Sequence, residues 1–176
     1  MTYAYDEMYL DSALKNLGEA FDYAVNACHL DAERFLDLFI SVGFAEDFGK
    51  GSPRLVAGLS GTELVMEVLA KAGLATVFPG SQTEYDFSPE YWCGWILAYY
   101  QWKTGRTFSD IRESIPMTEL LKLSRLIDGA IEVAHDHGKN PCLRGNGYNE
   151  YVRKYCTKVS GTLLFRRAPR AGQGKS

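Results

Sequence analysis

The chain has 176 residues, of which 46% are hydrophobic and 23% are charged, proportions typical of a globular domain with a substantial core. No apolar run approaches the ~18 residues that span a bilayer, and the N-terminal residues lack the basic and apolar regions of a signal peptide. We therefore expect neither a membrane protein nor a secreted protein, and we expect a cytoplasmic location.

The net charge of −3 hides an uneven distribution. Residues 1–136 carry 10 Lys and Arg against 21 Asp and Glu, whereas residues 137–176 carry 9 basic residues and one acid, Glu150. We therefore predict an acidic helical domain at residues 1–138, followed by a basic tail at residues 139–176. The tail is expected to be partly disordered or to fold on binding, because it has little apolar surface to bury.

The first 136 residues of the chain are predicted to be mostly helical. Apolar residues recur at steps of three and four from Leu14 to Cys28, which is the spacing of one face of a helix. Asp31 is a favourable N-cap for the next helix, and Ser52 followed by Pro53 combines a cap with the residue favoured at the first helical position. Helices are expected, in chain order, near residues 14–28, 31–42, 45–48 and 52–56.

Capping sequences mark two further helix starts. Residues 60–63, Ser-Gly-Thr-Glu, match the capping box, in which the Ser and Glu side chains each bond the other residue's backbone N–H, and Gly73 closes this helix. Residues 74–87 are rich in turn formers and are predicted to be irregular. Ser88 then caps a helix that begins at Pro89.

The helix after Pro89 contains all three tryptophans of the chain. Trp92, Trp95 and Tyr99 share one helical face, and other apolar residues cover most of the remaining surface. A helix that is apolar nearly all round is usually buried inside a bundle. The sequence therefore predicts an all-α fold, a single multi-helix bundle with this aromatic helix at its centre.

The C-terminal edge of the aromatic helix is the candidate surface for a protein partner. Trp, Tyr and Arg dominate the binding energy of protein interfaces, and this edge combines protruding aromatic side chains with basic ones. The predicted partner-binding residues are Tyr100, Trp102, Lys103 and Arg106.

The remaining chain is predicted to change from helical to irregular. Thr107 begins a short helix, Pro116 interrupts it, and Thr118 caps a long helix that runs towards His135. Beyond Gly138 the sequence is loop-like, and residues 151–165 fit either a helix or a short hairpin. Basic and aromatic residues alternate there, as in proteins that bind nucleic acid through its backbone and by stacking. The predicted nucleic-acid-binding residues are Arg153, Lys154, Lys158, Arg166, Arg167 and Arg170.

No catalytic constellation, metal site or cofactor site is predicted. His135, His137, Cys142 and Cys156 lack the paired spacing of zinc ligands, and two histidines two residues apart on a helix face different sides. Ser60 lacks the final glycine of a nucleophile elbow and is better explained as a helix cap. The four cysteines are widely spaced and are expected to be free thiols.

Three stretches carry a resemblance to a known group of proteins: residues 39–45, 51–64 and, most specifically, 91–111. They resemble a helical module of unknown function from gut anaerobes, the N-terminal part of small proteins that often end in a helix-turn-helix domain and lie beside toxin–antitoxin-like genes. The match covers roughly residues 8–135. No helix-turn-helix motif follows residue 138, so the resemblance implies a helical protein-binding module rather than a reader of DNA.

By type, an acidic helical module of this size also resembles an anti-CRISPR protein, which inhibits a Cas nuclease. The sequence therefore favours a non-enzymatic inhibitor or regulator from mobile DNA that binds a Cas effector nuclease or a toxin. The alternative is a transcriptional regulator or nucleic-acid-binding protein that acts through the basic tail. An enzyme is the third and weakest hypothesis, and the sequence leaves the oligomeric state open.

Overall fold

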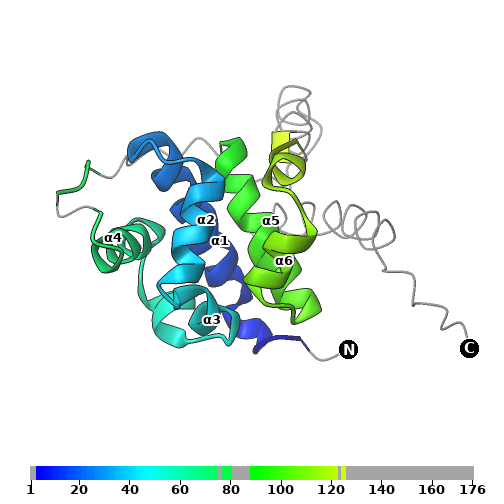
Figure 1. The fold of residues 1–176 in the computed structure, drawn as a ribbon. Coiled ribbons are helices and arrows are strands. Elements are labelled where there is room, and N and C mark those ends of the chain that lie inside the picture. Colours follow the sequence, from blue (N-terminus) through cyan, green and yellow to red (C-terminus); the bar gives the residue numbers. More distant parts are fainter. Residues whose placement is uncertain (1–2, 75–76, 81–87, 123, 126–176) are drawn as a thin grey trace, which may run out of the picture. The chain divides into compact units, whose positions relative to one another are not determined.

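The computed structural model describes residues 3–74, 77–80, 88–122 and 124–125, and every element among them is helical (Figure 1). In chain order the elements are η1 (Glu7–Tyr9), α1 (Leu10–Asp22), η2 (Tyr23–Ala27), α2 (Ala32–Ser41), α3 (Phe44–Gly49), η3 (Arg54–Gly58), α4 (Gly61–Lys71), α5 (Pro89–Thr104) and α6 (Phe108–Ser114). The predicted all-α bundle is therefore confirmed for the described residues.

The chain divides into two units, Met1–Glu132 and Val133–Ser176, and all the described residues belong to the first. The predicted basic tail and the predicted domain boundary at residue 138 lie outside the described residues.

Helix α1 is the element against which most of the others pack. Its most extensive contact is with α5, and α4 and η3 also lie against it. Leu14, Leu17 and Phe21, which form the predicted apolar stripe, are at most 1% exposed. Elsewhere on α1, the Asn16 side-chain amide donates a hydrogen bond of 2.8 Å to the carbonyl of Leu55 in η3. The periodicity thus identified the buried face of α1 correctly.

Glycines let the neighbouring helices approach the backbone of α1. A Cβ added at Gly94 of α5 would lie 2.2 Å from the carbonyl oxygen of Leu17, and one at Gly18 would lie 2.8 Å from the ring of Tyr91. A Cβ at Gly61, the first residue of α4, would lie within 2.6 Å of three atoms of α1. These distances leave no room for a side chain, so glycine sets the spacing of both helix pairs.

Helix α5 is buried along nearly its whole length. Every residue from Tyr91 to Trp102 is buried, and the rings of Trp92 and Trp95 are only 1% and 2% exposed. This confirms the prediction that the aromatic helix forms the centre of the bundle. Although α5 is apolar, neither it nor any other helix among the described residues is long and apolar enough to cross a membrane.

A cluster of phenylalanines joins α2, α3 and α6. The rings of Phe39, Phe48 and Phe108 meet edge to face, with centroids 5.5 to 6.0 Å apart, and all three are at most 2% exposed. Edge-to-face packing is favourable because the positive edge of one ring meets the negative face of another. This cluster fixes the short helices α3 and α6 beside the C-terminal half of α5.

The helix that begins with α1 ends in a π-helical turn, η2, which the periodicity did not predict. At its start the buried carboxylate of Asp22 accepts hydrogen bonds from the side chains of Asn26 and Ser88. Ser88 is also the N-cap of α5, where its hydroxyl accepts the backbone N–H of Tyr91. The wider π turn therefore lies in a polar network that joins the end of α1 to the start of α5.

The predicted helix caps are largely confirmed. Ser60 and Glu63 form both bonds of the capping box, and Ser88 caps α5. The prediction that Thr118 caps the next helix is wrong, because that helix begins at Met117. The carbonyl of Pro116 accepts the backbone N–H groups of the residues three and four positions later, which places Thr118 inside the first turn.

Replacement of Gly94 with alanine is expected to destabilise the domain by about 3 kcal/mol, because the new methyl group overlaps the backbone of α1. Urea unfolding would measure the loss. Gly80→Ala is the matched control: a Cβ at Gly80 meets no atom within 4 Å, so its effect should stay within about 0.5 kcal/mol. Equal free energies of unfolding for the two variants would contradict the close approach of α1 and α5.

Candidate functional site

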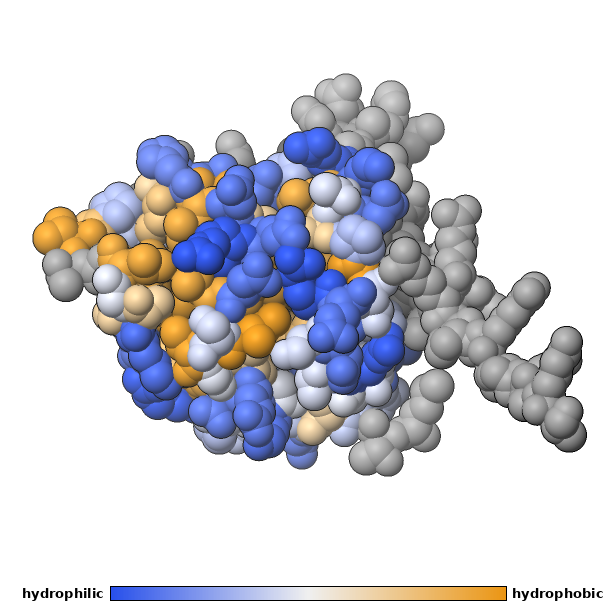
Figure 2. Space-filling view, viewed as in Figure 1, coloured by the Kyte–Doolittle hydropathy of each residue, from blue (hydrophilic) through white to orange (hydrophobic). Residues whose placement is uncertain are grey.

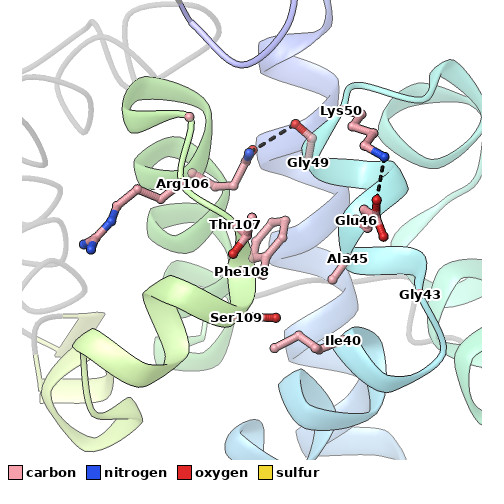
Figure 3. A pocket seen from close by; sticks show the side chains of 12 residues that line it. Ile40, Gly43, Ala45, Glu46, Gly49, Lys50, Arg106, Thr107, Phe108 and Ser109 are labelled. Carbon is pink, nitrogen blue, oxygen red and sulfur yellow. Dashed lines mark hydrogen bonds and ion pairs between the residues drawn. The ribbon is translucent and has the colours of Figure 1, made fainter.

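A cavity of about 340 Å³ opens between α3 and the turn that leads from α5 to α6 (Figure 3). Gly105 adopts a left-handed conformation (φ 66°), which ends α5 and turns the chain towards α6. The cavity is lined by Ile40, Gly43, Ala45, Glu46, Gly49, Lys50, Gln101, Gly105, Arg106, Thr107, Phe108 and Ser109. It therefore combines apolar walls with a small number of polar groups, as small-molecule sites do.

One polar group in this cavity lacks a partner among the described residues. Gln101 is 2% exposed, and its side-chain N–H donates a hydrogen bond of 3.1 Å to the carbonyl of Gly49. Its side-chain oxygen, Oε1, is buried and accepts no hydrogen bond within the described part of the chain. A buried acceptor in this state costs about 1–3 kcal/mol, so Gln101 weakens the packing at the end of α5.

The rim of the cavity carries three charged groups, Glu46, Lys50 and Arg106. The ammonium of Lys50 lies 2.5 Å from a carboxylate oxygen of Glu46, one turn earlier on α3. Their hydrogen bond, followed by the attraction of opposite charges, lowers the pKa of Glu46 and raises the pKa of Lys50. On the opposite side, Arg106 extends away from the cavity (Figure 3). The lining therefore holds two basic residues, Lys50 and Arg106, against one acid, Glu46.

The predicted partner-binding edge divides into buried and exposed residues. Tyr100 and Trp102 are 5% and 4% exposed, so the expectation that these side chains protrude is wrong. Lys103 is half-buried, with its ammonium 5.5 Å from the ring centroid of Tyr99, and Arg106 is exposed. Of the four predicted residues, only the two basic ones reach the surface, and Arg106 alone lines the cavity.

The N-terminal segment is what covers Trp102. The ring of Tyr3 stacks on the indole with centroids 4.0 Å apart and planes 6° apart. The indole N–H donates to the carbonyl of Tyr5 at 2.9 Å, and the backbone N–H of Ala4 donates to the carbonyl of Trp102 at 3.0 Å. Tyr5 in turn packs against Gly51, where a Cβ would lie only 2.4 Å away. Residues 3–5 thus form a strap over the end of α5.

A second hollow, of about 390 Å³, lies on the exposed side of α2. Its lining holds three acidic residues against one basic residue, Arg34, together with apolar side chains. It consists of Asp31, Ala32, Glu33, Arg34, Asp37, Met117, Thr118 and Leu121. Arg112 of α6 donates hydrogen bonds to both Glu33 and Asp37, which holds the two carboxylates side by side. The hydrogen bond with Asp37 is the main cause that raises the pKa of Arg112. We call this hollow the acidic groove.

The surface around α2 and α6 is hydrophilic, while apolar surface lies between α2 and α4 (Figure 2). Five basic side chains of the described residues are held in ion pairs with neighbouring acids. They are Lys15, Lys50, Arg54, Arg112 and Lys122. Since acids outnumber bases in this part of the chain, the pairing leaves a surplus of negative charge on its surface.

The predicted nucleic-acid-binding residues lie outside the described residues, as do both histidines of the rejected zinc site. Arg153, Lys154, Lys158, Arg166, Arg167 and Arg170 remain predictions. Where the structure does describe the chain, no group of three or more His, Cys, Asp or Glu side chains is placed to hold a metal ion.

Two features of these sites were missed from the sequence. Gln101 is a polar residue within a helix predicted to be apolar on all sides, and this exception was the available signal for a polar group in the core. The acidic groove had no comparable signal, because Arg112 and its partners Glu33 and Asp37 are 75 or more residues apart in the chain.

Comparison with protein-family models, curated proteins and solved structures finds no match to this chain. The resemblance of residues 91–111 to a helical module of gut anaerobes therefore stays a prediction.

Tyr3→Ala is expected to expose Trp102, because the stacked ring is the part of the strap that covers the indole face. Quenching of tryptophan fluorescence by acrylamide should increase, and the free energy of unfolding should fall by about 1 kcal/mol. The same substitution in a Trp102→Phe background is the control, since Trp92 and Trp95 lie elsewhere on α5. An equal increase in quenching in that background would show that the strap does not act on Trp102.

The two described cysteines are expected to differ in reactivity. Burial raises the pKa of the Cys93 thiol to about 12, so almost none of it is thiolate near neutral pH. Cys28 is only half-buried. In a variant with Cys142→Ser and Cys156→Ser, a thiol reagent should modify Cys28 in the folded protein and Cys93 only after unfolding. Rapid modification of Cys93 in the folded protein would contradict its position in the core.

Proposed function

We propose that this chain is a non-enzymatic, protein-binding regulator whose acidic surface docks on a basic surface of its partner. The observation that supports it most directly is the acidic groove, whose lining combines three carboxylates with apolar side chains. Such a combination suits the Lys and Arg side chains of a partner, because their stems are apolar and their ends are charged. Inhibition in the manner of an anti-CRISPR protein or of an antitoxin would follow if that basic surface normally holds nucleic acid.

The arrangement of the groove favours binding of a cation over self-pairing. Arg112 is a single positive charge shared by Glu33 and Asp37, so the three groups together keep a negative charge. Asp31 stands at the N-cap position of α2 but makes no capping hydrogen bond. Its carboxylate therefore remains available to a partner at the mouth of the groove.

The class of partner follows from this charge. Nucleases and toxins that act on DNA or RNA line their binding grooves with Lys and Arg to neutralise phosphates. An acidic protein that occupies such a groove competes with the nucleic acid, and its affinity falls as salt rises. We therefore propose a Cas effector nuclease or an RNA- or DNA-directed toxin as the partner.

Neutralisation of the groove with Asp31→Asn and Asp37→Asn is expected to weaken inhibition of a guide-loaded Cas nuclease, or of the toxin, by about tenfold at low salt. DNA- or RNA-cleavage assays over a range of salt concentrations would measure the effect. The matched control is Glu7→Gln with Asp47→Asn, which removes the same charge from η1 and α3. Equal weakening by both pairs would show that the groove is not the docking surface.

Deletion of residues 139–176 distinguishes this proposal from the alternative that the basic tail binds nucleic acid. A truncated protein that still inhibits its partner supports docking through the helical body. A truncated protein that loses both inhibition and retention on DNA or RNA would assign the function to the tail and its six predicted basic residues.

A further inference from the structure

The strap of residues 3–5 shows that the end of α5 can hold a polypeptide backbone. Trp102 lies in the last turn of α5, where carbonyl groups lack the usual helical partner four residues later. The backbone N–H of Arg106 bonds a threonine side chain instead, and the N–H of Ala4 bonds the Trp102 carbonyl at 3.0 Å. The indole N–H of Trp102 donates to the carbonyl of Tyr5 at 2.9 Å. One residue of α5 therefore binds two successive residues of the strap.

Two aromatic rings flank this stretch of backbone, and each has its own place on the bundle. The ring of Tyr3 stacks on the indole of Trp102, with centroids 4.0 Å apart, and remains 47% exposed. The side chain of Tyr5 lies against Gly51, where a Cβ would be 2.6 Å from the first ring carbon. Trp102 and Gly51 thus form a slot for two aromatic side chains separated by one residue. We call it the strap slot.

The second ring position of the strap slot does not suit a hydroxyl group. The hydroxyl of Tyr5 is buried and has no hydrogen-bond partner within the described part of the chain. Burial raises the pKa of this phenol, so the unpaired O–H persists near neutral pH. A phenylalanine ring would fill the same space and would leave no polar group without a partner. The strap therefore fits its own slot less well than a Phe-containing segment would.

We propose that the strap slot is a docking site for a short segment of another protein, with the pattern aromatic–any residue–phenylalanine, and that the strap masks the slot until such a segment displaces it. The pattern follows from the two ring positions and from the unpaired hydroxyl of Tyr5. A second copy of this chain is a poor occupant, because its strap has the same misfit and competes with a strap already tethered beside the slot. The inference goes beyond the proposed function and does not depend on the acidic groove.

The test is a titration of the full-length ¹⁵N-labelled protein with short blocked peptides, followed by nuclear magnetic resonance at the indole N–H of Trp102. The variant Ala4→Pro loses the backbone N–H that holds the strap and changes no residue of the slot. A peptide of residues 3–7 that carries Tyr5→Phe should bind this variant about tenfold more tightly than the wild-type protein, whose strap must first leave. Equal affinities for the two proteins would show that the strap does not mask the slot, and would overturn the proposal.

Three peptides test the predicted pattern on the Ala4→Pro variant. The peptide with Tyr5→Phe should bind about tenfold more tightly than the unchanged peptide, because it buries no unpaired hydroxyl. A peptide with alanine in place of both Tyr3 and Tyr5 should leave the Trp102 resonance unchanged. Equal affinities for the first two peptides, binding of the third, or no saturable shift with any of them would overturn the proposal.

Two glycine variants, made in the Ala4→Pro protein, place the peptide in the slot. Gly51→Ala puts a methyl group where the second aromatic side chain lies, and it should abolish peptide binding. Gly73→Ala is the matched control, since Gly73 has nearly the same left-handed backbone (φ 70° against 75°) but a Cβ there meets no atom within 4 Å. Peptide binding that survives Gly51→Ala, or that is lost equally with Gly73→Ala, would refute the assignment to the slot.

A change within the strap should have the opposite effect on the peptide. Tyr5→Phe in the full-length chain removes the misfit and holds the strap in place, so the peptide should bind this variant about tenfold more weakly than the wild-type protein. Unchanged or tighter binding would contradict the proposal. Sedimentation identifies the source of the segment: a wild-type dimer that Tyr3→Ala abolishes would assign the slot to a second copy of this chain and would overturn the proposal.

Discussion

The contact between α1 and α5 is the constraint on which the rest of the bundle depends. At Gly94 the two backbones meet without a side chain between them, and Tyr91 occupies the space that Gly18 leaves on α1. Because α5 lies this deep, its remaining faces must be covered by other elements. The phenylalanine cluster of α2, α3 and α6 covers one part, and the strap of residues 3–5 covers the end at Trp102.

The burial of α5 in the bundle also explains where the cavity forms. A helix that is central for most of its length must still reach the surface where it ends, and α5 does so at Gly105. There Gly43 and Ala45 at the start of α3 carry small side chains, and a Cβ at Gly43 would meet no atom within 4 Å, so this part of the lining stays open. Gln101 lies on the last buried turn of α5, and its side-chain N–H donates to the carbonyl of Gly49 at the end of α3.

Local sequence patterns predicted the elements and the centre of the core, because caps and periodicity depend on residues a few positions apart. Ser60, Ser88 and the stripe around Leu17 are confirmed for this reason. The burial of Trp102 could not be predicted in this way, since it depends on Tyr3 and Tyr5. Tyr5 lies 97 residues before Trp102 in the chain. The same applies to the acidic groove, which Arg112 assembles from α2 and α6.

The burial of α5 also changes what its aromatic sequence means for function. Residues 91–102 belong to the stretch, 91–111, on which the predicted resemblance mainly depends, and every one of them is buried in the bundle. A shared sequence in this helix would therefore indicate a shared fold and would give no information about a partner. Under the proposed function, recognition would reside in residues outside the core, such as Asp31, Arg106 and Ser109, all of which are exposed. Two proteins with the same aromatic helix could then share an architecture and bind different partners.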